Sequence, residues 1–292
     1  MSRLEVPLME RHEGAQWPAT ALQRLEQSRR GWVDRLGGVA DIGRRTALVT
    51  GAGRGIGRTV ATRLSSQGLR VALTARSRDE LELTASECRG DTLVLPADIT
   101  GAGAVDTLWS EVEAAWGRVD VLVANAGAGV SARVHRTTDE EWQRMLDLNL
   151  TAPFRCLRRA LPSMLDQRWG RVVVVASVAA KVGEPYIAAY TASKHGVLGL
   201  GRSAAAEVAA SGVTVNAICP GYVDTPMTDA TVAGIVDKTG RSLEEARQIL
   251  ADKQPSRRLV TADEVAGAAW ACVVNGAING QGLNVDGGAV QS

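Results

Sequence analysis

The chain has 292 residues, a formal net charge of +1, and a composition that is 45% hydrophobic and 22% charged. This balance gives no reason to expect nucleic acid or an anionic membrane as a partner. The longest apolar stretch, around residues 172–180, is too short to span a bilayer, and no apolar N-terminal region marks a signal peptide. The four scattered cysteines lack metal-ligand spacing and fit a reducing compartment. We therefore expect a soluble cytoplasmic protein without a metal site.

Residues 1–43 precede the first predicted strand. Apolar side chains recur there at roughly helical spacing, with charges between them: Leu22, Leu25, Trp32, Val33 and Leu36. They predict a short amphipathic helix that packs on the domain or on a neighbouring subunit. Disorder before about residue 18, as a mis-assigned start codon would leave, is nearly as well supported. A membrane-surface helix is less favoured, because the charges are mixed in sign.

A phosphate-binding turn is predicted after the strand at residues 46–50, TALVT. The next residues read GAGRGIG and lead into a helical stretch, RTVATRLSSQG. Glycines let the backbone approach a pyrophosphate closely, and a helix N-terminus favours negative charge. The spacing is Gly51-x-x-x-Gly55-x-Gly57, with Ile56 at the last position of the G-x-G-x-x-G fingerprint, so the loop departs from that motif.

Predicted strands and helices alternate along the rest of the chain. Apolar runs predict strands at TALVT, LRVALTA, TLVLP, VDVLVANAG, RVVVVAS, VTVNAI and GLNVDGG, and helical stretches lie between most of them. No linker-like tract rich in Pro, Ser or Gly interrupts the alternation. The pattern predicts one α/β domain built on a parallel sheet.

Tyr190 and Lys194 lie four residues apart in YTASK, and Ser177 closes the run RVVVVAS. Residues i and i+4 share one helix face, so the phenol and the ammonium are expected to point into the same space. A nearby cation favours the phenolate, so Lys194 should lower the pKa of Tyr190 and make it a general acid or base near neutral pH. The Ser177 hydroxyl can hold a carbonyl oxygen beside that phenol. The structural alternative is a core serine and a solvent-facing lysine.

The chain resembles the single-domain short-chain dehydrogenases/reductases over roughly residues 44–292. The matching pieces are TGAGRGIG (50–57), ADI (97–99), NAG (125–127), Asn149, Ser177, YTASK (190–194) and PGYVDT (220–225). Ala124 departs from the family, which usually has asparagine there. The resemblance implies a doubly wound Rossmann-type sheet of about seven parallel strands with helices on both faces. It also implies a substrate lid near residues 222–255 and a homotetramer or homodimer.

The resemblance also implies which residues bind cofactor and perform catalysis. The catalytic residues would be Asn149, Ser177, Tyr190 and Lys194. The cofactor would contact Gly51, Arg54, Gly55, Ile56, Gly57, Arg76, Asp98, Ile99, Asn125, Ala126, Gly127, Tyr190, Lys194, Pro220, Gly221, Val223 and Thr225. Candidate substrate residues are Val130, Glu184, Tyr186, Tyr222 and Met227. Glu184 would either repel a carboxylate substrate or face solvent ahead of Pro185.

The second predicted strand indicates the choice of cofactor. NAD-using members of the family generally carry an acid at its end, where this chain has Ala75 followed by Arg76. A guanidinium can pair with the 2′-phosphate of NADPH in a forked geometry, and Arg54 in the glycine loop offers a second one. We therefore expect NADPH rather than NADH, although both arginines could be ordinary surface residues.

The resemblance implies reduction of a ketone to a secondary alcohol, with Tyr190 as the proton donor. The segments around Ser177 and Pro220 look similar to bacterial ketoacyl and aromatic-polyketide ketoreductases, which favours a 3-ketoacyl thioester or polyketide-like substrate. One alternative is an NAD(P)-dependent alcohol dehydrogenase that oxidises a cyclic or sterol-like alcohol. A remote alternative is a non-catalytic NADPH-binding sensor.

Overall fold

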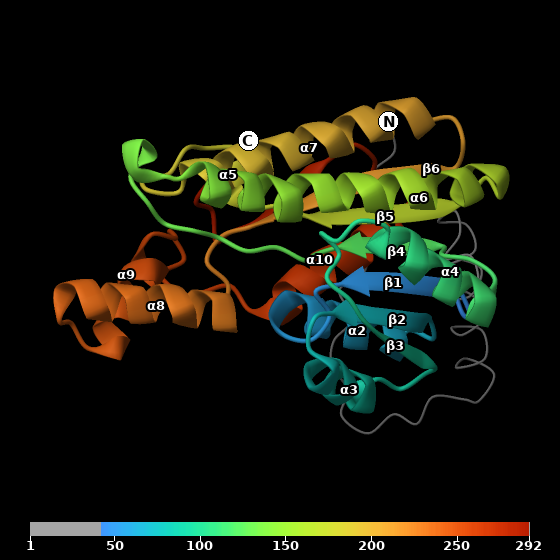
Figure 1. Ribbon diagram of the computed structural model, residues 1–292, viewed down its shortest axis with the longest axis horizontal. Coiled ribbons are helices and arrows are strands. Elements are labelled where there is room, and N and C mark those ends of the chain that lie inside the picture. Colours follow the sequence, from blue (N-terminus) through green and yellow to red (C-terminus); the bar gives the residue numbers. More distant parts are fainter. Residues whose placement is uncertain (1–41, 292) are drawn as a thin grey trace, which may run out of the picture. The chain divides into compact units, whose positions relative to one another are not determined.

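The computed structural model describes residues 42–291, and seven parallel strands form its sheet in the order β3-β2-β1-β4-β5-β6-β7 (Figure 1). The strands are β1 (Thr46–Thr50), β2 (Arg70–Ala75), β3 (Thr92–Pro96), β4 (Val121–Ala124), β5 (Gly170–Val175), β6 (Val213–Pro220) and β7 (Gly282–Val285). The predicted fold class is confirmed. The order reverses between β1 and β4, and open α/β sheets bind ligands beyond the carboxyl ends of the strands at such a point.

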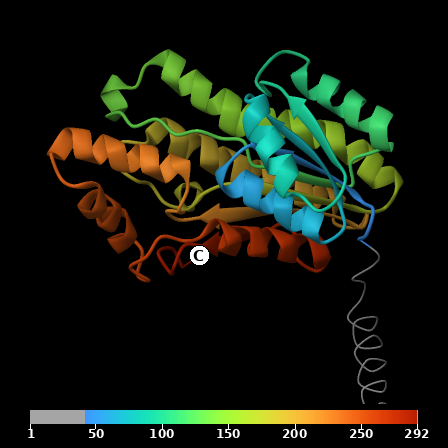
Figure 2. The same ribbon diagram turned by 90° about the horizontal axis from the view of Figure 1, so that it is seen from below.

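Helices cover both faces of the sheet (Figures 1 and 2). The helices are α2 (Gly55–Ser66), α3 (Arg78–Glu87), α4 (Ala104–Trp116), α5 (Asp139–Leu146), α6 (Ala152–Asp166), α7 (Ala188–Val208), α8 (Pro226–Thr239), α9 (Leu243–Asp252) and α10 (Ala262–Val274). Side chains alternate along each strand, so Val172 faces the core under α4, α6 and α7, whereas Val173 faces the core under α2 and α10. Burial on both faces explains the continuous apolar runs in the sequence.

Helices α8 and α9 form a unit with a small apolar cluster of its own, built around Val232, Ala246 and Leu250. The chain leaves the main domain and returns to it at one place, where Val223 pairs with Val260 in a parallel bridge. This excursion corresponds to the helix–turn–helix expected near the substrate lid, and its role as a lid stays a prediction.

Residues 1–41 lie outside the described part of the chain, so the amphipathic helix proposed for residues 1–43 stays a prediction. Within residues 42–291, no helix combines the length and the apolar character needed to cross a membrane. The same residues contain no group of three or more His, Cys, Asp or Glu side chains that could hold a metal ion.

Candidate active site

The four residues expected to perform catalysis meet beyond the carboxyl edge of the sheet. Ser177 follows β5 and begins a short 3-10 turn, η3 (Val178–Ala180), where its side chain accepts a hydrogen bond from the backbone of Ala179. Tyr190 and Lys194 lie in the first turns of α7. Asn149 lies in a single π-helical turn, η2 (Asp147–Thr151), between α5 and α6. Such turns widen a helix locally and occur often at functional sites.

Lys194 is buried, and its ammonium lies 5.6 Å from the centre of the Tyr190 ring. It donates a hydrogen bond of 2.8 Å to the carbonyl of Val175 at the end of β5. Burial lowers the pKa of Lys194 to about 8, because an ammonium is costly in an apolar environment. The lysine therefore loses its charge at a pH well below that of a solvated lysine.

Burial raises the pKa of Tyr190, and a hydrogen bond with Ser177 works in the opposite direction. The groups Tyr222, Glu184 and Cys219 add to the rise. The expectation that Lys194 lowers the pKa of Tyr190 is therefore wrong for this arrangement. The physical reason is that burial removes the water that would solvate the phenolate, and the Lys194 ammonium is directed at the Val175 carbonyl.

Asn149 is buried and joins three segments of the site. Its Nδ2 donates to the carbonyl of Ala128 at 3.0 Å and to the Ser193 hydroxyl at 3.2 Å, and its Oδ1 accepts from the backbone of Ala128 at 3.1 Å. The Ser193 hydroxyl in turn donates to the carbonyl of Tyr190 at 2.7 Å. Asn149 thus ties the loop after β4 to the first turn of α7.

The glycine loop is shaped to bring backbone close to a ligand. Gly51 adopts a φ of +65°, in the region that favours glycine. A Cβ on Gly57 would lie 2.1 Å from the Gly51 carbonyl oxygen, so only glycine fits there. Asn125 braces the loop by donating from Nδ2 to the carbonyls of Thr50 at 2.9 Å and Gly51 at 3.2 Å.

Helix α2 begins directly after this loop, and its Arg54 cap residue makes no side-chain hydrogen bond to the first turn. That turn carries no acidic side chain, so its N–H groups and the helix dipole are suited to an anion. Loop and helix fit the pyrophosphate of a dinucleotide. Ile56 packs against the core at the start of α2.

Charged groups surround the edge where the adenosine half of a dinucleotide would lie. Arg76 is exposed after β2, and Arg54 pairs with Glu80 at 3.6 Å. Hydrogen bonds from Thr100 lower the pKa of the Asp98 carboxyl, and the charge of Arg76 adds to this effect. Ile99 beside it is buried. Sequence reasoning did not find Glu80, because nothing along the chain indicates that α3 returns to the glycine loop.

The segment Pro220–Thr225 meets the glycine loop from the other side. A Cβ on Gly55 would lie 3.3 Å from the Thr225 side chain, so Thr225 reaches the middle of that loop. The Thr225 hydroxyl donates to the carbonyl of Val223 at 3.3 Å. The side chain of Gln254 fills the space beside Gly221, where a Cβ would lie 2.2 Å from its Oε1. The predicted cofactor residues after β6 therefore lie beside those after β1, and Ala126 joins them by donating to the Thr50 hydroxyl at 3.0 Å.

The predicted substrate residues divide into a bonded pair and a looser set. Tyr222 donates from its hydroxyl to Glu184 Oε1 at 2.8 Å, and Lys253 pairs with the same carboxylate oxygen. Glu184 is thus paired with a cation and 28% exposed, and whether it repels a carboxylate substrate stays a prediction. Tyr186 and Met227 are more than half exposed, and Val130 is partly buried. Lys253 was not found from the sequence, because 69 positions separate it from Glu184.

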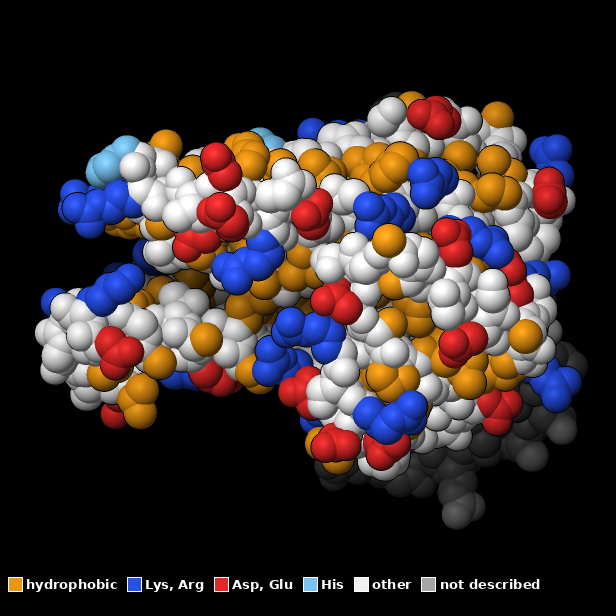
Figure 3. All heavy atoms as spheres, viewed as in Figure 1, with side chains coloured by type: hydrophobic (Ala, Val, Ile, Leu, Met, Phe, Trp, Pro, Cys, Tyr) orange, Lys and Arg blue, Asp and Glu red, His pale blue; other side chains and the backbone are white. Residues whose placement is uncertain are grey.

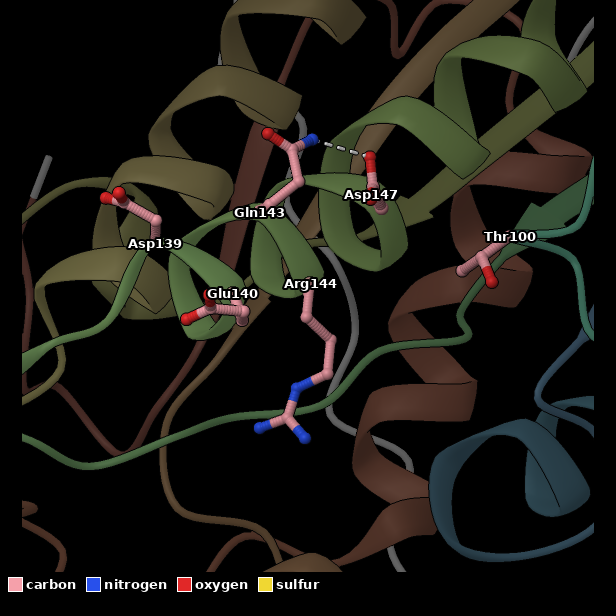
Figure 4. A pocket seen from close by; sticks show the side chains of 6 residues that line it. All are labelled: Thr100, Asp139, Glu140, Gln143, Arg144 and Asp147. Atoms are coloured by element: carbon pink, nitrogen blue, oxygen red, sulfur yellow. Dashed lines mark hydrogen bonds between the residues drawn. The ribbon is translucent and has the colours of Figure 1, made fainter.

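The molecular surface is hollowed between the α5 side and the α8–α9 unit (Figure 3). A separate shallow pocket of about 460 Å³ lies beside α5, lined by Thr100, Asp139, Glu140, Gln143, Arg144 and Asp147 (Figure 4). In that pocket Gln143 bonds Asp147 at 2.8 Å and Arg144 extends outward. It contains none of the four catalytic candidates, so we assign the chemistry to the region around Tyr190.

Comparison with known proteins agrees with this geometry. The family model for short chain dehydrogenases matches residues 45–235. The chain is 34% identical to D-beta-hydroxybutyrate dehydrogenase of Rhizobium meliloti, over 84% of this chain and 98% of that protein. It is 41% identical to 3-oxoacyl-(acyl-carrier-protein) reductase FabG of Staphylococcus aureus, over 64% of this chain and 77% of that protein. A crystal structure of a variant of actinorhodin polyketide ketoreductase with NADPH superimposes with a TM-score of 0.80 at 36% identity, covering 84% of this chain and 97% of that one.

Proposed function

Because this chain belongs to the short chain dehydrogenase family, and is therefore an oxidoreductase acting on CH–OH and C=O groups with NAD(P), we propose that it uses NADPH to reduce a ketone to a secondary alcohol. The observation that carries the proposal is the meeting of Ser177, Tyr190 and Lys194 beside a glycine loop that accepts no Cβ at Gly57. A binding protein without turnover would need the loop but not the catalytic residues.

The choice of NADPH rests on charge at the end of β2. Arg76 is exposed there, no acid occupies position 75, and Arg54 adds a second guanidinium. These groups suit a 2′-phosphate. A structural relative at 36% identity was crystallised with NADPH, which supports the same choice. Glu80 competes for Arg54, so Arg76 is expected to contribute more to discrimination.

Each of the four catalytic side chains has its own role in the proposed reaction. NADPH supplies the hydride when it is bound. The Tyr190 hydroxyl, which keeps its proton because burial raises its pKa, donates that proton to the carbonyl oxygen. The Ser177 hydroxyl positions the same oxygen by a hydrogen bond. Lys194 would hold the nicotinamide ribose, and Asn149 would support a path for the replacement proton. The reverse reaction, alcohol oxidation, uses the same groups.

A 3-ketoacyl thioester is the substrate class that we favour. Two of the similar proteins are reductases named for 3-oxoacyl and polyketide substrates. The similarity to D-beta-hydroxybutyrate dehydrogenase favours the oxidation of a hydroxy acid as the second candidate. The ion pair between Lys253 and Glu184 is compatible with both, because it cancels the charge that would repel an acidic substrate.

The deciding experiment measures NADPH consumption with a 3-ketoacyl thioester and with a cyclic ketone that lacks the thioester. We expect a clear preference for the thioester, whereas a preference for the plain ketone would place the enzyme among general carbonyl reductases. Tyr190→Phe should abolish turnover and leave NADPH binding largely intact. Stoichiometric NADPH binding by the wild type without turnover of either ketone would support the sensor alternative.

A further inference from the structure

Three polar side chains from distant parts of the chain meet near the candidate catalytic tyrosine. Glu184 lies in the loop between η3 and α7, Tyr222 follows β6, and Lys253 ends α9. Lys253 donates to Glu184 Oε1 and, at 3.1 Å, to the Tyr222 hydroxyl. Its ammonium also lies 5.2 Å from the centre of the Tyr222 ring. Each member therefore contacts both of the others.

The side chain of Lys253 is 47% exposed and that of Glu184 is 28% exposed. Partial burial works to lower the pKa of Lys253, but its bonds with Glu184 and Tyr222 outweigh that effect and raise it. Burial, followed by the bond to Glu184, raises the pKa of Tyr222, so its hydroxyl remains a donor. Lys253 therefore stays a cation and Tyr222 a protonated phenol across the neutral pH range.

The network connects the α8–α9 unit to the loop that leads into α7. The unit is joined to the main domain at the Val223–Val260 bridge, and Arg247 of α9 pairs with Asp224. Lys253, directly after α9, adds an attachment to the loop before α7. The loop on the other side is held as well, because the backbone of Ala132 donates to the Tyr186 carbonyl at 2.8 Å. Tyr186 adopts a φ of +69°, a strained value for a tyrosine, so this loop is constrained rather than relaxed.

We propose that Lys253, Glu184 and Tyr222 form a latch that fixes the α8–α9 unit against the loop before α7. All three are positioning residues, and the latch does not depend on the proposed function.

Lys238→Met is the matched control, since Lys238 is an exposed lysine of α8 outside the network. Lys238→Met and Lys253→Met each remove one ammonium group, and only Lys253→Met removes it from the latch.

Amide hydrogen exchange over residues 226–252 tests the latch without any substrate. Lys253→Met should speed exchange there severalfold relative to Lys238→Met, and exchange in β4 and β5 should stay unchanged. Equal exchange in the two variants would show that Lys253 does not hold the unit. If the wild type turned over no ketone, the proposed function would fail, and this measurement would still decide whether the latch exists.

Discussion

At the scale of single residues, Lys194 shows how burial limits a functional charge. In the proposed reaction it binds the ribose hydroxyls as a cation, yet it is buried and its only hydrogen bond among the described residues is to the Val175 carbonyl. A Cβ on the neighbouring Gly127 would lie 2.9 Å from Asn149 Oδ1, so glycine at that position leaves room for the asparagine. The result is an ammonium with a pKa of about 8.

This value predicts the pH range in which reduction weakens. The charged form of Lys194 predominates below pH 8 and is lost as the pH rises through about 8. Tyr190, whose pKa is raised, keeps its proton there. We therefore expect kcat/KM for NADPH-dependent reduction to fall about tenfold per pH unit above the pKa of Lys194. A pH profile from 6 to 10 measures this, and a flat profile through pH 9.5 would contradict it.

Arg76 carries the prediction for cofactor choice. Arg76→Asp removes a guanidinium and places a carboxylate where NADPH would have its 2′-phosphate, so NADPH selectivity over NADH should fall at least roughly tenfold. Fluorescence titration with both nucleotides measures the ratio of dissociation constants.

Arg78→Asp is the control for Arg76→Asp, because Arg78 is exposed at the start of α3 and pairs with Glu82. The control should keep the wild-type ratio. An unchanged ratio in Arg76→Asp would leave the preference for NADPH without support.

At the scale of elements, the sequence predicted every strand of the sheet and the glycine loop. Strands buried on both faces must be apolar throughout, so β5 and β6 are visible as runs in the sequence. The glycine loop is recognisable in the sequence because positions 51 and 57 accept only glycine: Gly51 has a positive φ, and a Cβ at Gly57 would clash with the Gly51 carbonyl. Such features depend on the types of residues that lie close together in the sequence, so the sequence alone predicts them.

Features that depend on distant contacts were not predictable in the same way. Lys253 joins Glu184 only because α8 and α9 return to the main domain. The pKa of Tyr190 depends on solvation, which one i,i+4 pair does not reveal. The π-helical turn at Asn149 arises from tertiary bonds to Ala128 and Ser193, and helix periodicity gives no sign of it.

The glycine loop also allows a prediction at this scale. Gly57→Ala places a Cβ 2.1 Å from the Gly51 carbonyl oxygen and 2.5 Å from Asn125 Nδ2, so the loop must shift. Such overpacking costs about 1–3 kcal/mol. We expect a lower Tm and NADPH binding weakened at least roughly tenfold, as measured by thermal denaturation and calorimetric titration.

Gly199→Ala is the matched control for Gly57→Ala. Gly199 lies in α7 without a positive φ, and a Cβ added there would meet no atom within 4 Å. Alanine at this position should raise stability by up to about 1 kcal/mol, because it favours the helix. If both variants bound NADPH as the wild type does, the close approach at Gly57 would not serve the cofactor.

At the scale of the whole molecule, the two layers of helices leave the carboxyl edge of the sheet free for chemistry. Val223 and Val260 pair beyond that edge, so the α8–α9 unit begins and ends where the glycine loop meets Thr225. A movement of this unit would therefore displace groups at the proposed cofactor site and at Glu184 together. This arrangement predicts coupling between cofactor binding and closure of the proposed lid over the substrate.

The outer helices predict association into a dimer or tetramer. Trp142 on α5 and Phe154 and Leu165 on α6 are each about 40% exposed, and orange side chains gather along α6 in Figure 3. Exposed apolar side chains that form a contiguous patch mark a contact surface. We expect sedimentation velocity to show a dimer or tetramer at micromolar concentration, and Phe154→Lys to shift it toward the monomer. Leu243→Lys, at a more exposed position of α9, should leave the assembly intact. A wild-type monomer under these conditions would contradict the prediction and would leave the apolar side chains of α5 and α6 without a role.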